Sequence, residues 1–384
     1  MRKVMVVSGT RPEAIKLAPV VHSLESSHNL ETIVVATGQH RSMLDQVNHL
    51  FGIEPAYDLD ILRDRPNLAG ITAAVVEGLG PILDKEQPDL LVVEGDTTTV
   101  FAAALAAFYA KIPVAHVEAG LRTGDRYNPY PEEMNRRLTT NLTSLHLAPT
   151  PISRANLLAE GVDPETVHIT GNTVIDALLD VTGRNLPASD PLLAGVTAES
   201  RVVLITSHRR ENWGEPMENI GRAIARLSVA FPASTFVLPA HLNPTVRDAL
   251  LPPLHGLGNV IVTDPVDYVD MAYLLNASTL VITDSGGVQE EAPSLGKPVL
   301  VLRETTERPE AVDAGTVRLI GTDEDTIVAE ATRLLTDRHA YSAMARAVNP
   351  YGDGLAAERI RGAVEYFFGL GPRPDEFVAG GTPS

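Results

Sequence analysis

The chain contains 384 residues and no cysteine, and its formal net charge at pH 7 is −18. This length suits two domains of ordinary size. The lack of cysteine excludes disulfides, thiolate zinc sites and a cysteine nucleophile. Nucleic-acid-binding proteins usually carry a basic surface, so the acidic charge argues against a nucleic-acid partner. No apolar run approaches the roughly 20 residues of a membrane-spanning helix, and we expect a cytoplasmic protein without membrane contact.

Short apolar runs rich in valine and isoleucine recur along the chain, each followed by turn residues. The run near the N-terminus is too short for a secretion signal, so we interpret it as a first buried strand. The predicted strands are Val4–Val7, Thr32–Val35, Leu90–Val93, Val114–Val117, Leu145–Leu147, Val167–Ile169, Val202–Ile205, Thr235–Leu238, Val260–Val262, Leu280–Ile282 and Val299–Leu302. Helical patterns separate many of them, and the alanine-rich Val100–Ala110 is the plainest. This alternation predicts parallel sheets with helices on both faces.

One stretch without clear periodicity, Thr182–Arg201, contains prolines and glycine and is interpreted as a linker. We therefore predict two doubly wound, Rossmann-like domains, residues 1–180 and residues 181–365. Residues 366–384 are rich in proline and glycine, and we expect this segment either to pack back or to be disordered. Because such sheets bind ligands at the carboxyl ends of their strands, we expect the active site in the cleft between the domains.

Charged residues follow the predicted strands of the first domain. Arg11 and Lys16 follow the first strand and would supply positive charge for a diphosphate, unless both are ordinary surface bases. Asp96 and Glu118 each follow another strand, and Glu132 opens a helix. Each carboxylate alone is also typical of a helix start. A cluster of three can hold one carboxyl protonated and another ionised, which predicts acid–base catalysis.

A metal site is the rival explanation for these three carboxylates. The histidines nearest to them in sequence, His116 and His146, fall within predicted strands and do not follow a ligand pattern. We therefore favour acid–base chemistry without a metal.

The loop Asp284–Gly287 in the second domain joins a strand to a short helix. Adjacent glycines let backbone N–H groups approach a phosphate, and the helix N-terminus adds positive charge. A carboxylate near the start of that helix, Glu290 or Glu291, can accept hydrogen bonds from ribose hydroxyls. The plain alternative is that Asp284 or Ser285 caps the helix and the glycines form a turn.

Two further loops of the second domain carry candidate anion ligands. His208 lies beside Arg209 and Arg210 directly after a strand, where it can donate to a phosphate or carry a proton; a structural histidine is the alternative. Arg308 follows a later strand and is either another anion ligand or part of a surface salt-bridge network.

These segments together resemble one family, the non-hydrolysing UDP-N-acetylglucosamine 2-epimerases, in family order over roughly residues 1–365. The matching stretches are GTRPEAIKLAPV at Gly9–Val20, VEGDTTTV at Val93–Val100, HVEAGLRTGD at His116–Asp125, PEEMNRR at Pro131–Arg137, ITGNTVIDAL at Ile169–Leu178, SHRREN at Ser207–Asn212, HLNP at His241–Pro244 and TDSGGVQEEAPSLGKPVLVLRETTERPEA at Thr283–Ala311.

The resemblance implies a glycosyltransferase-B-like fold and the reversible interconversion of UDP-GlcNAc and UDP-ManNAc. In this family UDP is eliminated to give 2-acetamidoglucal and then added back, with no metal or redox cofactor. The implied partners are the two nucleotide sugars and UDP, and the implied assembly is a homodimer.

The resemblance also implies roles for individual residues. Asp96, Glu118 and Glu132 match the acid–base carboxylates, and His208 matches the catalytic-site histidine. Substrate contacts are implied for Arg11, Lys16, Arg137, Met271, Ser285, Gly286, Gly287, Glu291 and Arg308. Our hypothesis is that Glu118 or Asp96 removes the C2 proton, with Glu132 assisting.

The chain departs from the family at two places. Val266 and Met271 stand where some members carry Gln and Phe near the uracil site, so we expect backbone contacts to replace those side chains in binding the base. Many bacterial members also bind a second UDP-GlcNAc as an activator, and Gln39, His40, Arg209 and His241 match that allosteric site. Ser42 and Arg65-Pro66-Asn67-Leu68 differ from the usual residues there, so we expect weaker activation or none.

Three other functions remain open. A hydrolysing epimerase would release free ManNAc and UDP and shares these loops. A glycosyltransferase shares the fold and the ribose carboxylate, but has no need of three clustered acids. A catalytically inactive sugar-nucleotide sensor would keep the arginines and the Ser-Gly-Gly loop, and the intact carboxylates argue against it.

Overall fold

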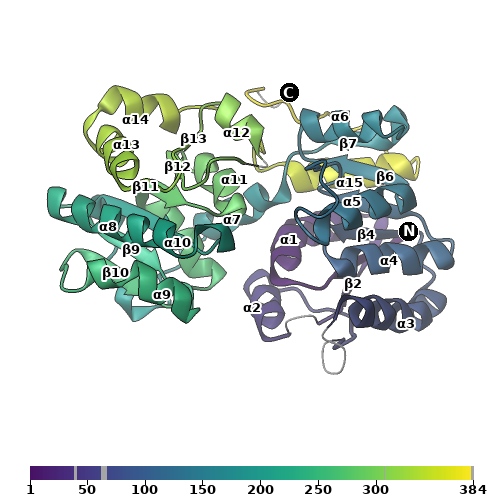
Figure 1. Ribbon diagram of the computed structural model, residues 1–384. Coiled ribbons are helices and arrows are strands. Elements are labelled where there is room, and N and C mark those ends of the chain that lie inside the picture. Colours follow the sequence, from purple (N-terminus) through teal and green to yellow (C-terminus); the bar gives the residue numbers. More distant parts are fainter. Residues whose placement is uncertain (39–40, 62–66, 307, 382–384) are drawn as a thin grey trace. The chain divides into compact units, whose positions relative to one another are not determined.

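The chain folds into two compact units, each with its own parallel sheet and core (Figure 1). The first unit comprises Met1–Ala177 together with the residues from Tyr351 onward, and the second comprises Leu178–Pro350. The computed structural model describes residues 1–38, 41–61, 67–306 and 308–381, with the backbone alone for residues 41–43.

The first unit alternates strands and helices along the chain. Its elements are β1 (Arg2–Ser8), α1 (Arg11–Glu25), β2 (Leu30–Ala36), α2 (Arg41–Phe51), β3 (Tyr57–Asp58), α3 (Leu68–Glu86), β4 (Leu90–Glu94), α4 (Thr98–Tyr109), β5 (Val114–Val117), α5 (Glu132–Leu142), β6 (Leu145–Ala148), α6 (Pro151–Ala159), β7 (Val167–Ile169), α7 (Thr173–Gly183), which continues past Ala177, and α15 (Ala356–Phe367). The sheet is parallel in the order β3-β2-β1-β4-β5-β6-β7.

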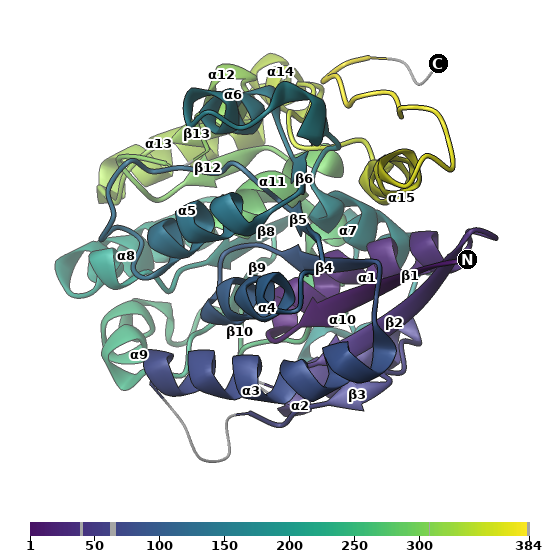
Figure 2. The same ribbon diagram turned by 90° about the vertical axis from the view of Figure 1, so that its right-hand side faces the viewer.

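Both faces of this sheet are buried, which explains its continuous apolar strands. Successive side chains of a strand point to opposite faces. Met5 and Val7 of β1 pack with α3 and α4, whereas Val4 and Val6 pack with α1 and α15. Figure 2 shows α3 and α4 together on one side of the sheet. A strand that is buried on both faces carries apolar residues at successive positions and does not alternate between polar and apolar residues.

The C-terminal part of the chain returns to the first unit, and this corrects the expected domain boundary. We expected residues 181–365 to form the second domain, but the chain re-enters the first unit at Tyr351. The reason is the apolar face of α15, where Ile360 and Val364 are fully buried against the core that contains α1. The segment after α15 also packs back, because Phe377 is buried and its N–H donates to the carbonyl of Ile169 at 2.8 Å.

The second unit repeats the same architecture with a smaller sheet. Its elements are β8 (Val202–Thr206), α8 (Glu215–Ala230), β9 (Phe236–Pro239), α9 (Pro244–Leu250), β10 (Val260–Thr263), α10 (Tyr268–Ala277), β11 (Ser278–Thr283), α11 (Gly286–Ser294), β12 (Val299–Val301), α12 (Pro309–Asp313), β13 (Val317–Leu319), α13 (Glu324–Thr336) and α14 (Arg338–Ala345). The strands are parallel in the order β10-β9-β8-β11-β12-β13. The predicted linker Thr182–Arg201 contains two short 3-10 turns.

The predicted fold class, two doubly wound parallel sheets, is confirmed. Each predicted strand occurs, with ends that differ by a few residues at most. The short edge strands β3 and β13 were not predicted; β13 carries the exposed Arg318 at its centre and so lacks a continuous apolar run. Within the described residues, none of the helices combines the length and apolar character that a membrane span requires.

Candidate active site

The predicted site residues gather where the strand order of each sheet reverses. In the first sheet the reversal lies between β1 and β4, and in the second it lies between β8 and β11. Helices leave such neighbouring strands on opposite faces, so their loops part and open a crevice for ligands. After β1, Arg11 is the first residue of α1, and Asp96 follows β4 in a loop; the loops after β8 and β11 carry His208 and Ser285.

Lys16 binds two carboxylates at the switch point of the first sheet. Its ammonium group pairs with Glu118 Oε2 in a short hydrogen bond and lies 3.1 Å from Glu94 Oε1. Both carboxylates are buried, with 8% of Glu118 and 2% of Glu94 exposed. Lys16 thus supplies the local positive charge without which two buried carboxylates would repel each other strongly.

Burial raises the pKa of Glu94 well above its ordinary value; the Lys16 charge opposes this rise, and a hydrogen bond with Glu118 adds to it. Burial likewise raises the pKa of Glu13, whose Oε2 accepts the N–H of Gly9 at 2.7 Å. This end of the sheet therefore contains carboxyl groups that favour the protonated form beside an ammonium group.

The backbone of Glu118 adopts an unusual conformation. Its φ is +64°, in the left-handed region that costs a residue with a side chain about 1–3 kcal/mol. Two residues further on, Gly120 has φ +94°, and a Cβ there would lie 2.2 Å from the carbonyl oxygen of Ser153. The chain therefore turns sharply after β5 and is packed tightly against α6. This turn holds the Glu118 carboxylate beside Lys16.

Asp96 is held by an arginine that the sequence analysis did not select. Arg136 of α5 donates from Nε to Asp96 Oδ2 at 2.8 Å, and its second nitrogen lies 2.7 Å from the same oxygen. Arg137, for which the resemblance implies a substrate contact, instead donates to Glu133 Oε1 at 3.0 Å. Glu133 is fully buried and also accepts the N–H groups of Thr123 and Gly124. A role of Arg137 in substrate binding stays a prediction.

Glu132 is the first residue of α5, as its position after Pro131 predicted. Its Oε2 is buried and has no hydrogen-bond partner among the described residues. An unsatisfied buried acceptor costs about 1–3 kcal/mol, so a donor on a bound ligand would be stabilised there. The role of Glu132 in catalysis stays a prediction.

Asp284 anchors the loop after β8 and is not a helix cap. It is fully buried, and its Oδ2 accepts the N–H groups of His208 and Arg209 at 3.0 Å each and the side-chain amide of Asn212 at 3.0 Å. The hydroxyl of Ser207 donates to the same oxygen at 2.9 Å. This carboxylate thus ties the two loops at the switch point of the second sheet into one unit.

The N-terminus of α11 is open, as a diphosphate loop requires. Ser285 is the N-cap residue, but its side chain makes no capping hydrogen bond. Unpaired N–H groups at a helix N-terminus attract anions. A Cβ on Gly287 would lie 3.6 Å from Glu291 Oε2, which places the expected ribose carboxylate beside the expected diphosphate loop.

Arg308 lies against Gly286 at this helix start. A Cβ on Gly286 would be 2.6 Å from a terminal nitrogen of the guanidinium group. Arg308 Nε also donates to Glu290 Oε1 at 2.5 Å, and Glu290 is buried. Glycine at position 286 therefore leaves room for a guanidinium group next to the N–H groups of α11, where a phosphate would meet both.

The remaining predicted residues of the second unit are more exposed. His208 has 46% of its side chain exposed, with Nδ1 3.3 Å from Asp284 Oδ1, and burial of the rest lowers its pKa. Met271 is partly exposed on α10, and His241 is exposed after β9. Arg209 is partly exposed, and its Nε is buried without a hydrogen-bond partner among the described residues. Gln39 and His40 lie outside the described residues.

Two other features of the structure do not belong to this site. His116 and His146 each bond to a backbone carbonyl, those of Gly95 at 2.7 Å and Thr140 at 3.3 Å, as expected of structural histidines. The described residues include no group of three or more His, Cys, Asp or Glu arranged to hold a metal ion.

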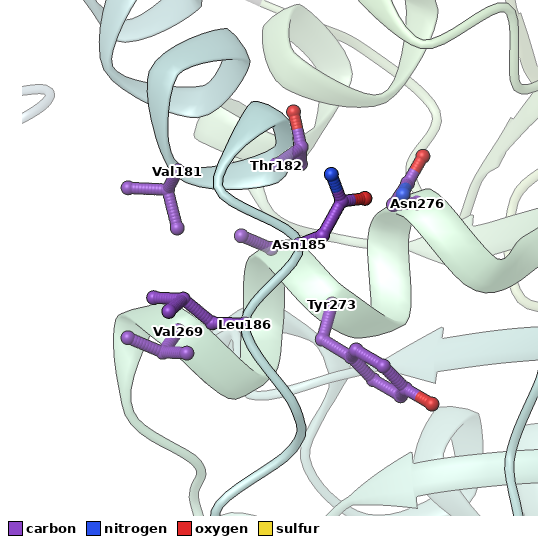
Figure 3. Close-up of a pocket in the computed structure, with 8 residues that line it drawn as sticks. Val181, Thr182, Asn185, Leu186, Val269, Tyr273 and Asn276 are labelled. Atoms are coloured by element: carbon purple, nitrogen blue, oxygen red, sulfur yellow. The ribbon is translucent and has the colours of Figure 1, made fainter.

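A hollow of about 130 Å³ beside α10 is lined by Val181, Thr182, Asn185, Leu186, Val269, Ala272, Tyr273 and Asn276 (Figure 3). Because this lining contains no Lys, Arg or His, it does not suit a diphosphate.

Four features of the site were not predicted: Glu94, Glu13, Arg136 and the anchoring role of Asp284. Glu94 ends a buried strand, and a charged residue at the last buried position of a strand was the available signal. The partners of these residues lie far away in the sequence, so spacing alone gave no reason to select them.

Comparison with known proteins assigns the chain to a family. The family model for UDP-N-acetylglucosamine 2-epimerase matches residues 22–365. A UDP-N-acetylglucosamine 2-epimerase of Salmonella typhimurium is 53% identical over 372 residues, covering 95% of this chain and 99% of that protein. The crystal structure of a UDP-GlcNAc 2-epimerase from Neisseria meningitidis bound to UDP-GlcNAc has 48% identity and a TM-score of 0.86, covering 96% of this chain and all of that one.

A glycotransferase of kitacinnamycin is only 14% identical but has a TM-score of 0.62 over 94% of this chain and 99% of its own. This likeness concerns the fold alone, and it agrees with the expected glycosyltransferase-B-like architecture. With matches of this extent and identity, the chain belongs to the UDP-N-acetylglucosamine 2-epimerase family.

Proposed function

We propose that this protein interconverts UDP-GlcNAc and UDP-ManNAc by reversible epimerisation at C2, without hydrolysis. Family membership supports the substrate class, since the Neisseria meningitidis relative is solved with UDP-GlcNAc bound. The observation that carries the chemical part is Glu118, a buried carboxylate that pairs with Lys16 and lies in a left-handed turn directly after β5.

The sugar dictates the reaction type. C2 of the sugar bears no carbonyl group, so its proton is not acidic enough for simple removal. If the C1–O bond to UDP breaks as the proton leaves, the electrons of the C2–H bond form a C1=C2 double bond and UDP takes the C1–O pair. The product is 2-acetamidoglucal. UDP then adds back to C1 while a proton is delivered to the opposite face of C2.

The first unit supplies the acid–base groups for this sequence. A general base must be ionised to accept a proton, and each candidate is paired with a cation: Glu118 with Lys16 and Asp96 with Arg136. Glu118 and Asp96 are the two candidates for the base. Glu132 presents a buried oxygen without a partner among the described residues and is the candidate to assist proton delivery.

The second unit supplies the groups that hold UDP. The open N-terminus of α11 with Ser285, Gly286 and Gly287 suits a diphosphate, and Arg308 adds a fixed positive charge beside it. His208 is held by Asp284 and can donate to the departing phosphate. Because the glycal must be recaptured, these groups must keep UDP bound after the C1–O bond has broken.

Product analysis tests the proposal. Purified protein is incubated with UDP-GlcNAc, and the nucleotide sugars and free sugars are separated by chromatography. We expect UDP-ManNAc at a constant ratio to UDP-GlcNAc, approached from either side. Accumulating free ManNAc and UDP would indicate a hydrolase, and UDP-GlcNAc binding without any product would indicate a sensor.

A variant separates binding from chemistry. Glu118→Gln should lose turnover while it keeps UDP affinity, because UDP contacts are assigned to the second unit. Loss of UDP binding in Glu118→Gln would refute an acid–base role for this residue. By resemblance we also propose a homodimer, which light scattering on the purified protein checks.

A further inference from the structure

Glu94 is a buried carboxyl group for which the proposed reaction has no use. It is the last residue of β4, and only 2% of it is exposed. Its neighbours Lys16 and Glu118 belong to the same unit and to the proposed acid–base machinery. A carboxyl group buried next to a catalytic carboxylate changes the charge and hydrogen bonding available to it.

The charges around Glu94 do not balance if every carboxyl group is ionised. Lys16 is the ammonium group that pairs with both Glu94 and Glu118, and the buried Glu13 lies close enough to act on Glu94 electrostatically. Burying an unpaired carboxylate is far more costly than burying its neutral form. At least one of these carboxyl groups is therefore expected to carry a proton.

The contacts show which group that is. A hydrogen bond joins the carboxyl groups of Glu94 and Glu118, and two carboxyl groups can bond only if one of them holds a proton. Lys16 forms its short hydrogen bond with Glu118 but stands 3.1 Å from Glu94. Burial raises the pKa of Glu13 too, but its Oε2 accepts the N–H groups of Gly9 and Thr10, which oppose that rise, whereas the hydrogen bond with Glu118 adds to the rise in the pKa of Glu94.

We propose that Glu94 is a positioning residue, a neutral carboxyl group that donates a hydrogen bond to Glu118 and leaves the positive charge of Lys16 to that carboxylate. Lys16 and Glu94 then both bond to the Glu118 carboxylate, and the left-handed backbone conformation of Glu118 fixes where its side chain starts. The role in catalysis rests on the proposed function, in which Glu118 handles the C2 proton; the neutral state of Glu94 does not.

Two substitutions at position 94 separate a neutral donor from a charged group. Glu94→Gln keeps the shape and a donor but removes the acid, and so imitates the protonated carboxyl group. Glu94→Leu keeps a similar volume and removes the donor. Glu31→Gln is the matched control, since Glu31 is a carboxylate on β2 of the same sheet, 3.9 Å from Lys3 and largely exposed.

Infrared spectroscopy tests the neutral state directly and needs no turnover. At neutral pH the protonated-carboxyl C=O band of the wild-type protein should lose intensity in Glu94→Gln and stay unchanged in Glu31→Gln. A Glu94→Gln spectrum equal to the wild-type spectrum in this region would overturn the proposal. This result stands even if the protein proves not to be an epimerase.

Steady-state kinetics test the positioning role. Glu94→Gln should keep kcat within about threefold, whereas Glu94→Leu should lower kcat about 10- to 100-fold, the range expected when a catalytic group is misplaced. KM and UDP affinity should equal the wild-type values in both variants, since the proposed UDP contacts belong to the second unit. A kcat in Glu94→Gln as low as in Glu94→Leu, or a normal kcat in Glu94→Leu, would contradict the role. Wild-type protein without epimerase activity would refute the proposed function instead.

Discussion

Replacing Gly286 by alanine tests the assignment of the diphosphate loop. The new Cβ would lie 2.6 Å from a terminal nitrogen of Arg308 and 2.8 Å from its Cζ, closer than real Cβ contacts allow. Gly286 has no positive φ, so alanine meets no backbone strain there. The guanidinium group must move, and it would leave both the start of α11 and its buried partner Glu290.

The expected loss follows from the contact that Arg308 would make with UDP. A hydrogen bond to a charged group contributes about 1.5–3 kcal/mol. Because about 1.4 kcal/mol corresponds to a factor of ten in affinity, Gly286→Ala should weaken UDP binding about 10- to 100-fold. Titration calorimetry with UDP measures this directly. Gly195→Ala is the matched control, because Gly195 lies in the same unit, has no positive φ and has nothing within 4 Å of an added Cβ.

A double-mutant cycle shows whether the effect passes through Arg308. If Gly286→Ala acts by displacing the guanidinium group, adding it to Arg308→Ala should cause little further loss. Additive losses would mean that the methyl group obstructs the phosphate itself. Unchanged UDP affinity in Gly286→Ala, or an equal loss in Gly195→Ala, would refute the assignment of Arg308 and the loop to diphosphate binding.

Three further predictions concern the framework of the site. Asp284→Asn removes a carboxylate that accepts hydrogen bonds from four donors at one buried oxygen. We therefore expect the free energy of unfolding to fall by about 3 kcal/mol and UDP to bind more weakly; an unchanged melting temperature would contradict this. Gly120→Ala should lower the melting temperature much more than Gly161→Ala, since both have positive φ but only the Cβ at Gly120 meets a backbone oxygen, at 2.2 Å; equal effects would show that strain alone matters. Burial raises the pKa of Asp176 from 3.8 to about 6, so its protonated form stabilises the fold below pH about 4, and that contribution of about 3 kcal/mol is lost as the pH rises to about 6. The free energy of unfolding of Asp176→Asn, measured in urea, should therefore rise relative to that of the wild type between pH 4 and pH 7. If the difference between the two free energies stays constant with pH, a raised pKa at Asp176 is contradicted.

The strands and the loops after them were predictable because their signals are local. A buried parallel strand needs a continuous apolar run, and the residue after it lies at the ligand-binding edge of the sheet. Asp96 and Glu118 were selected in this way and lie at that edge. Ser285 was selected from adjacent glycines before a helix, and its uncapped side chain fits the interpretation as an anion loop better than that of a plain helix cap.

The contacts between distant segments were not predictable from one sequence. Asp284 follows β11, and its role depends on β8 being the neighbouring strand, which no local pattern reveals. Lys16 was expected to bind a diphosphate, but its contacts with Glu94 and Glu118 appear only when α1, β4 and β5 are assembled. The amphipathic pattern of α15 predicts a helix with one buried face, but it does not say which unit covers that face.

The central claim is that UDP leaves and returns while the C2 proton is exchanged. Incubation of UDP-GlcNAc with the protein in D2O, followed by proton NMR, tests it most directly. We predict UDP-ManNAc that carries deuterium at C2, with deuterium also entering the UDP-GlcNAc pool and no free sugar. UDP-ManNAc that retains the original proton at C2, or ManNAc released together with UDP, would contradict the account.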